Sequence, residues 1–237
     1  MEDWQQRTVM LLGEEAVGRL TASSVAVVGV GGVGAVAAEM LARAGVGRLL
    51  LIDCDIVSDT NRNRQILALT STVGRPKCEV LRERLMDINP AIKVEIASEY
   101  VHEDTVDRLV AGVDAVLDAI DTLSPKIALI QHCLAEGLPL VSSMGSGAKL
   151  DATAVRLGDI SQTKMCPLAH MLRKRLHKLG INSGFLAVYS VEPPRRESVV
   201  LEESRNKKSQ VGTVSYLPAV FGCVCAQAVI GVLTEIK

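Results

Sequence analysis

Hydrophobic runs alternate with amphipathic segments along the first two thirds of the chain. The runs are short, rich in Val, Ile and Leu, and almost free of polar residues; they cover residues 25–30, 48–53, 92–97, 114–119 and 139–143. Such runs are typical of parallel strands whose two faces are both covered. Between them, apolar spacing predicts helices near 33–44, 76–88, 103–111 and 124–136. The alternation predicts an α/β fold built on a doubly wound, Rossmann-like, mostly parallel sheet.

The pattern changes after about residue 145. Two short strand-like pieces, 153–159 and 186–192, flank an amphipathic helix over 168–179 whose outer side is basic. Residues 193–212 are polar, charged and rich in turn formers. We therefore expect mixed strands and helices in the C-terminal third, with 193–212 forming a long mobile loop.

Size and composition suit one domain. The chain has 237 residues, of which 48% are hydrophobic. We expect a single domain over 1–237, with a nucleotide-binding core over 1–150 and an elaboration for substrate and dimer contacts over 151–237. The apolar run 217–233 contains Gln227 and several small residues, which favours a buried helix over a membrane span. With no basic and apolar start of the secretory kind, we expect a cytoplasmic protein without membrane contact.

Charge and cysteine content exclude several classes of protein. The net charge of −1 does not describe a polycation that coats nucleic acid, so any such contact must come from a local patch. Six aromatic residues are too few for a base-stacking platform of the single-strand-binding kind. The six cysteines form no CxxC pair, which indicates a reduced chain and no structural zinc.

The glycine-rich stretch GVGGVG follows the first predicted strand and opens the first predicted helix of the alternating pattern. Gly29, Gly31 and Gly34 let the backbone approach a phosphate, and the helix amides that begin near Gly32 favour its negative charge. Asp53 ends the next strand and could take a ribose hydroxyl. On these residues alone, NAD and ATP fit the site equally well.

Polar residues further along favour a triphosphate. The candidates lie at or after strand ends or begin a helix, and they are Asp55, Asn61, Arg64, Gln65, Lys77, Asp118 and Asp121. Arg64 offers a planar donor fork for phosphate oxygens, and Lys77 is a second cation. An acid after the fourth strand can hold Mg²⁺ against phosphates. Taken singly, each has an ordinary alternative: a loop or cap acid, a solvated polar loop, or a surface lysine.

In combination, GVGGVG, DCD, NRNRQ, Lys77 and DAID resemble the ubiquitin-activating-enzyme-like adenylating superfamily over residues 7–150. The resemblance implies that Asp53 binds the ribose and Asp121 holds magnesium. It implies triphosphate contacts from Asn61, Arg64, Gln65 and Lys77. It also implies a homodimer in which Arg7, from RTVMLLGEEAVGRL, reaches the site of the partner subunit. Positive charge there would stabilise a triphosphate that loses pyrophosphate.

Further segments, among them VGRPKCEVLRERLMDINP, SSMGSGAKLDAT and TKMCPLAHMLRKRL, extend the likeness to nearly the whole chain. They resemble one branch, the tRNA threonylcarbamoyladenosine dehydratases. That branch implies ATP-dependent adenylation of the threonylcarbamoyl carboxylate beside the anticodon, followed by ring closure with net loss of water. It also implies a cysteine desulfurase system as a candidate partner and a monovalent cation as a candidate ligand. The alternatives are an activator of a small sulfur-carrier or ubiquitin-like protein and, less favoured, an NAD-dependent oxidoreductase.

Cations gather in the C-terminal third, where they could contact tRNA phosphates. The candidates are Arg173, Lys174, Arg175, Lys178, Arg195, Arg196, Lys207 and Lys208. Phosphate contacts of this kind supply sequence-independent, salt-sensitive affinity. A solvated helix face is the ordinary alternative. For Cys166, in the polar stretch SQTKMCPLAH, we expect a packing role, because an intramolecular ring closure needs no cysteine nucleophile.

Overall fold

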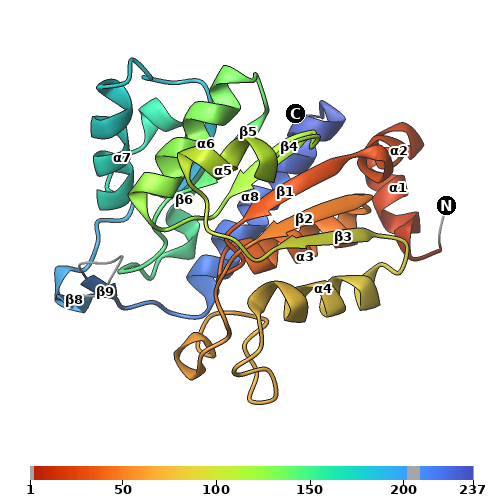
Figure 1. Ribbon diagram of the computed structural model, residues 1–237, viewed down its shortest axis with the longest axis horizontal. Coiled ribbons are helices and arrows are strands. Elements are labelled where there is room, and N and C mark those ends of the chain that lie inside the picture. The colour runs from red at the N-terminus through yellow and green to blue at the C-terminus, as the bar shows by residue number, and fades with distance from the viewer. Residues whose placement is uncertain (1–2, 202–208, 237) are drawn as a thin grey trace.

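A computed structural model describes residues 3–201 and 209–236 and contains a seven-stranded sheet of order β3-β2-β1-β4-β5-β7-β6 (Figure 1). The strands are β1 (Ser24–Val28), β2 (Arg48–Ile52), β3 (Lys93–Ala97), β4 (Ala115–Asp118), β5 (Leu140–Ser143), β6 (Val155–Asp159) and β7 (Leu186–Ser190). Neighbours pair in parallel except β6 and β7, which are antiparallel. The predicted doubly wound, mostly parallel α/β fold is confirmed.

Helices cover both faces of the sheet (Figure 1). One face carries α3 (Gly34–Ala44), α4 (Lys77–Ile88) and α8 (Tyr216–Thr234), and the other carries α5 (Glu103–Leu109), α6 (Leu123–Ala135) and α7 (Pro167–His177). Side chains alternate along a strand, so Val25 and Val27 of β1 pack with the first set, while Ala26 and Val28 pack with the second. Burial on both sides explains why the central strands read as unbroken apolar runs.

The two ends of the molecule carry different elements. The 3-10 turn Asp3–Gln5, α1 (Gln6–Leu12) and α2 (Glu14–Ala22) lie at one end in Figure 1. The opposite end carries α7 and a small hairpin of β8 (Val199–Leu201) and β9 (Ser209–Val211). Further 3-10 turns span Asp59–Asn61, Ala152–Ala154, Ile160–Gln162 and Arg196–Ser198.

The segment 193–212 differs from the expected unbroken loop. Its described part holds the antiparallel pair β8 and β9, in which Val199 lies opposite Val211. The backbone anchors the hairpin at both ends, since Arg195 N donates to Ala148 O at 2.8 Å and Ala148 N donates to Gly212 O at 2.8 Å. Apolar β-branched residues within the segment favour this strand pairing. The sequence did not predict it because most of the segment is charged or polar.

The C-terminal apolar run forms α8, as expected. By length and composition α8 could cross a membrane, but half of its apolar window is buried in this fold. It crosses α3 so closely that a Cβ at Gly222 would lie 2.6 Å from Val33 O. The buried Phe221 and Cys225 belong to the same core as Leu41. The helix therefore completes the hydrophobic layer on one face of the sheet.

Candidate nucleotide-binding site

The glycine turn joins β1 to α3 between the carboxyl ends of β2 and β4. Gly29 has φ +86°, and a Cβ there would lie 2.9 Å from Ala119 O. A Cβ on Gly34 would lie 1.8 Å from Gly29 O. Because no side chain fits at either position, the turn packs backbone against backbone and leaves its amide groups near the open edge. In doubly wound sheets this switch point is where nucleotides bind.

Asp53 fixes this turn to the end of β2. One carboxylate oxygen accepts from Val30 N at 2.8 Å, and the other accepts from Asp55 N at 2.8 Å. A carboxylate has about four acceptor positions, so Asp53 keeps capacity for a ribose hydroxyl after these two bonds. The same side chain can thus shape the turn and contact a sugar.

The segment that follows β2 forms a second wall. Asn61 is buried, and its Oδ1 accepts from Ser58 N at 3.1 Å, which fixes the turn that precedes Arg64. Gln65 is also buried, and its Nε2 lies 3.7 Å from the position of a Cβ on Gly31. Among the described residues, Gln65 Oε1 is the buried side-chain atom that lacks a hydrogen-bond partner.

That orphaned oxygen supports a ligand beside the glycine turn. A buried acceptor without a partner costs about 1–3 kcal/mol, so an amide held in this way is explained by a polar group that binds there. The Gly31 and Gly32 backbone forms a cradle that any larger residue would narrow, since a Cβ at Gly32 would lie 3.2 Å from Arg64 O. The residues present therefore fit a nucleotide.

Two cations stand along the second wall. Arg64 Nη1 donates to Thr60 O at 3.0 Å and to Asn63 Oδ1 at 2.8 Å, and Asn63 Nδ2 in turn donates to Thr213 O at 3.1 Å. Lys77 is 5% exposed rather than a surface lysine, and its Nζ lies 2.7 Å from Asp55 Oδ2. Asp55 thus orients Lys77, whose remaining donors stay available for an anion.

Asp118 ends β4, but its carboxylate contacts other groups of the protein and does not face a nucleotide. It is fully buried, its Oδ2 accepts from Ser142 Oγ at 2.7 Å, and its Oδ1 accepts from Ile120 N at 3.0 Å. Oδ2 also lies 2.7 Å from Lys126 Nζ, which is equally buried. An acid enclosed in this way has no open face toward a nucleotide. The expectation of an ATP-contacting Asp118 is therefore corrected to a structural role.

Lys126 shapes this edge of the sheet and was not predicted from the sequence. Its Nζ also donates to Ile120 O at 3.0 Å and to Ser143 O at 2.9 Å, so one ammonium joins the carboxyl ends of β4 and β5. A lysine inside the apolar stretch SPKIALI was the available signal. The network holds residues 119–121, and Asp121 is exposed just past β4 on the edge that carries the glycine turn.

A carboxylate grouping also lies at the end of β2. Ligand atoms of Asp53, Cys54 and Asp55 lie within 4.8 Å of one another. Since Asp53 accepts from two backbone amides and Asp55 pairs with Lys77, these acids have partners in the protein itself.

The cysteines are mostly packing residues. Burial raises the pKa of Cys78, Cys133 and Cys225 to about 12, so these thiols are protonated at neutral pH. Cys166 is buried at the residue before α7, in line with the packing role expected for it. Cys223 of α8, by contrast, is exposed.

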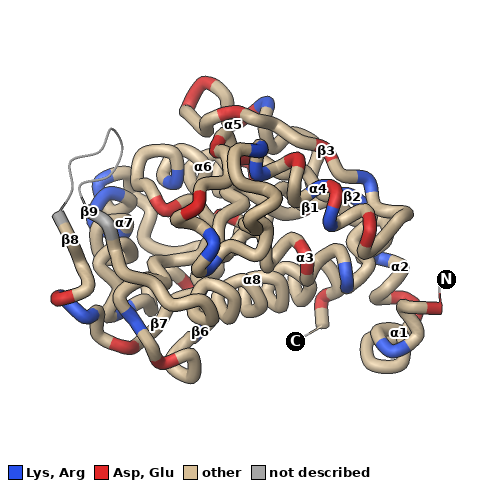
Figure 2. Tube along the Cα trace, turned by 90° about the horizontal axis from the view of Figure 1, so that it is seen from below, with Lys and Arg blue, Asp and Glu red and all other residues tan. Residues whose placement is uncertain are grey.

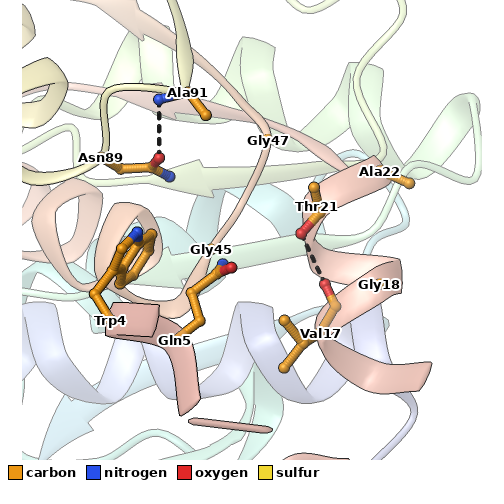
Figure 3. A pocket seen from close by; sticks show the side chains of 10 residues that line it. All are labelled: Trp4, Gln5, Val17, Gly18, Thr21, Ala22, Gly45, Gly47, Asn89 and Ala91. Carbon is orange, nitrogen blue, oxygen red and sulfur yellow. Dashed lines mark hydrogen bonds between the residues drawn. The ribbon is translucent and has the colours of Figure 1, made fainter. Parts of the chain in front are cut away.

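Arg7 lies far from the glycine turn of its own chain. It is exposed on α1, a helix without buried residues, and neighbouring Met10 and Leu11 are 85% and 83% exposed. The preceding Gln5 packs at Gly45, before β2 begins. A cavity of about 530 Å³ lies here, lined by Trp4 and Gln5 and by residues that precede β1 and β2 (Figure 3). The five residues of β1, roughly 17 Å in length, separate this end from the turn.

The described tRNA candidates gather at the other end of the molecule, near α7 and β8 (Figure 2). Lys174, Arg175, Lys178, Arg195 and Arg196 are exposed. Arg173 is partly buried, because its Nη1 donates to Thr163 O at 2.5 Å and contacts Thr163 Oγ1. Lys207 and Lys208 lie outside the described residues.

A Rossmann-like sheet with a glycine turn, an ordered acid and two cations at its switch point defines a nucleotide-binding adenylating-type protein. The chain belongs to the ThiF family, whose model matches residues 5–237. It is 41% identical over 92% of its length to the tRNA threonylcarbamoyladenosine dehydratase of Bacillus subtilis, covering 89% of that protein. It is 44% identical over 73% of its length to the Escherichia coli enzyme of the same name, covering 66% of that protein.

A solved structure agrees over the whole fold. The E. coli dehydratase TcdA in complex with ATP matches 99% of this chain and 96% of that one, with a TM-score of 0.90 and 35% identity. These similarities confirm the superfamily and the branch expected from the sequence. They also agree with ATP, rather than a redox dinucleotide, as the ligand of this group of proteins.

Proposed function

We propose that this chain is an ATP-dependent enzyme that dehydrates N6-threonylcarbamoyladenosine next to the tRNA anticodon. The similarity to a tRNA threonylcarbamoyladenosine dehydratase solved with ATP, over 99% of this chain, carries the proposal. The site supports it, since Gln65 Oε1 lacks a partner beside a glycine cradle and two cations flank that cradle. We also propose a cytoplasmic location, as expected from the sequence.

The reaction has two steps. The side-chain carboxylate attacks the α-phosphorus of ATP, which forms an acyl adenylate and releases pyrophosphate. A nitrogen or oxygen of the same side chain then attacks the acyl carbon, loses its proton, and releases AMP. The product is a ring that has lost one water relative to the substrate. Both steps need cations next to the phosphate oxygens, because negative charge develops on those oxygens during the reaction.

Each candidate residue has a task in this scheme. Asp53 binds the ribose, the glycine-turn amides and Asn61 hold the phosphate end, and Gln65 supplies a polar contact within the cradle. Arg64 and Lys77 bind the triphosphate, with Asp55 orienting Lys77 at 2.7 Å. Asp121 is the residue that would hold Mg²⁺, which neutralises phosphate charge when bound. The cysteine desulfurase partner and the monovalent cation stay predictions of the resemblance.

The active species is a homodimer in which Arg7 acts across the interface. Its position at the amino ends of the strands keeps Arg7 from its own glycine turn, whereas exposed Met10 and Leu11 give α1 an apolar surface for a second copy.

The phosphates of tRNA contact exposed cations on and near α7. These are Lys174, Arg175, Lys178, Arg195 and Arg196.

Mass spectrometry of tRNA nucleosides tests the reaction directly. We expect N6-threonylcarbamoyladenosine in tRNA to lose the mass of one water when enzyme, ATP and Mg²⁺ are all present. AMP and pyrophosphate should form in equal amounts. Omission of ATP and replacement of Lys77 by Ala are the controls, and both should abolish the change. An unchanged nucleoside with the complete mixture would refute the proposal.

A further inference from the structure

A second hollow opens beside α7, on the end of the molecule that carries the exposed cations. It measures about 390 Å³, and Met165, Pro167 and Pro194 give it an apolar floor, with Cys166 among them. Three side chains that can carry positive charge complete its lining: Lys164, His170 and Arg173. We call this hollow the α7 pocket. Apolar surface beside cations suits one nucleotide, because the base can contact the apolar side chains while the phosphate faces the cations.

Hydrogen bonds from Lys149 and Arg173 fix the segments that line the α7 pocket. Lys149 is 3% exposed, and its Nζ donates to Met165 O at 3.2 Å and to Glu192 O. One buried ammonium therefore joins the segment before α7 to the segment that precedes Pro194. From the other side, Arg173 Nη1 donates to Thr163 O at 2.5 Å. A hollow braced by a buried cation is preorganised rather than a chance gap between loops.

Met165 also has an unusual backbone. It is one of three described non-glycine residues with positive φ, at +56°, a conformation that side chains rarely adopt. The turn leaves the Met165 side chain 53% exposed at the pocket instead of in the core. The same turn buries the neighbouring Cys166.

The α7 pocket shares a sheet edge with the nucleotide-binding site. Gly145 follows β5, and a Cβ at Gly145 would lie 3.5 Å from Cys166 Sγ. Strand β5 pairs with β4, which pairs with β1 and so leads to the glycine turn. At about 4.8 Å per strand, the ends of β1 and β5 are on the order of 10 Å apart. One nucleotide of an RNA strand can therefore contact the pocket while the threonylcarbamoyl group of a neighbouring nucleotide reaches the ATP.

We infer that the α7 pocket binds one nucleotide of the tRNA anticodon loop adjacent to the modified adenosine. Its base rests on Met165, Pro167 and Pro194, and its phosphate faces Lys164, His170 and Arg173. The inference rests on the proposed function and adds a specific site to it. It assigns roles to Lys164, Met165 and His170, which lie outside the run of cations expected to contact tRNA.

The test pairs changes in the RNA with changes in the pocket. Wild-type protein is titrated with anticodon stem-loop RNAs in which each loop base in turn is replaced by an abasic site. At one loop position the loss should be about tenfold in affinity, as expected when a base loses roughly 55 Å² of apolar contact. Met165→Gly, which suits the positive φ, should reduce that penalty to less than twofold. Met171→Ala, at an exposed methionine on α7 outside the pocket lining, should leave the penalty unchanged.

A charge series tests the phosphate side. Lys164→Glu and His170→Glu should weaken stem-loop binding at least tenfold and flatten its dependence on salt, because a phosphate contact is lost. Lys93→Glu, at an exposed lysine of β3, is the matched control. ATP binding should be unchanged in all three, which shows that each variant is folded.

Two results would overturn the inference. One is an abasic penalty that is equal in wild type and Met165→Gly at every loop position. The other is unchanged stem-loop affinity in both charge variants. If wild-type protein still removes water from the modified tRNA nucleoside, only the α7 pocket assignment fails. If it does not, the proposed function fails independently of the pocket.

Discussion

At the scale of single residues, steric and electrostatic constraints are concentrated around the glycine turn. Gly29 and Gly34 leave no room for a Cβ, and the buried pair of Asp118 and Lys126 ties the neighbouring strand ends together. Gln65, by contrast, is held in place with an unused acceptor. The first four residues shape the edge of the sheet, and the fifth is placed to meet a ligand.

Replacing Gly34 by Ala should abolish ATP binding. The added methyl would lie 1.8 Å from Gly29 O, so the turn must move and its amides lose their alignment. Gly18→Ala is the control, because a Cβ there meets nothing within 4 Å and alanine favours the helix by about 0.5–1 kcal/mol. Isothermal titration with ATP measures both. Wild-type affinity in the Gly34 variant would contradict the close approach.

Replacing Lys126 by Met should destabilise the fold strongly. The change leaves the Asp118 carboxylate buried without its cation, a loss of about 3–5 kcal/mol. Urea unfolding measures the free energy of unfolding. Combining Lys126→Met with Asp118→Leu should recover much of the loss, because no charge then stays buried. Lys93→Met at an exposed site is the control, and an equal effect there would rule out a special role for the buried pair.

At the scale of elements, helices α3 and α4 are joined by one buried carboxylate. Glu39 of α3 is 6% exposed and accepts from Arg84 of α4 at 2.6 Å and from Arg43 at 2.9 Å. Burial acts to raise the pKa of Glu39, and the bonds from Arg84 and Arg43 outweigh it, so the pKa lies below its usual value. The ion pair therefore fixes the packing of α4 against α3 at neutral pH.

The stability contributed by Glu39 should depend on pH. A lowered folded-state pKa means that the contribution is present above the usual carboxyl value of 4.5 and is lost as pH falls through the folded-state pKa. The gap in Tm between wild type and Glu39→Gln should be largest above pH 5 and shrink toward pH 3. Thermal unfolding across this range measures it. Glu136→Gln, at an exposed glutamate, should show no such trend, and a constant gap for Glu39 would contradict the prediction.

At the scale of the whole molecule, Arg7 lies at the opposite end of the strands from the glycine turn and the α7 pocket. The glycine turn occupies the carboxyl edge of the sheet, the α7 pocket lies further along that edge, and α1 with Arg7 lies beyond the amino ends of the strands (Figure 1). In the proposed homodimer, a second subunit would bring Arg7 to the triphosphate.

Mixed dimers test this arrangement. Arg7→Ala and Lys77→Ala should each be inactive alone, since one lacks the arginine and the other lacks the lysine of every site. In an equal mixture about half of the dimers combine the two variants, and each of these has one intact site out of two, so the mixture should recover about a quarter of wild-type activity. Pyrophosphate release measures recovery, and light scattering checks that both variants are dimers. Full activity of Arg7→Ala alone, or no recovery on mixing, would exclude action across the interface.

Expected and observed features agree where interactions are local in the chain and differ where they join distant residues. The central strands and the glycine turn were predictable because local patterns encode them: apolar runs for β1 and β2, and GVGGVG for the tight strand-to-helix turn. Asp118 was expected to contact ATP because its position at the end of a strand says nothing of the lysine eight residues later. The hairpin of β8 and β9 was missed because its apolar residues, Val199 and Val200 on one strand and Val211 on the other, lie in a charged and polar segment.

The sequence by itself determined the α/β alternation, the phosphate-binding turn and the set of residue types that a triphosphate needs, since each is written in consecutive residues. Only the tertiary structure decided which of them meet. It buried Lys77 against Asp55, left Gln65 Oε1 without a partner, and placed Arg7 beyond reach of its own site. It also brought Pro194 to α7 to form a pocket. The reason is physical: burial, ion pairing and distance depend on contacts between residues far apart in the chain, and no local pattern records them.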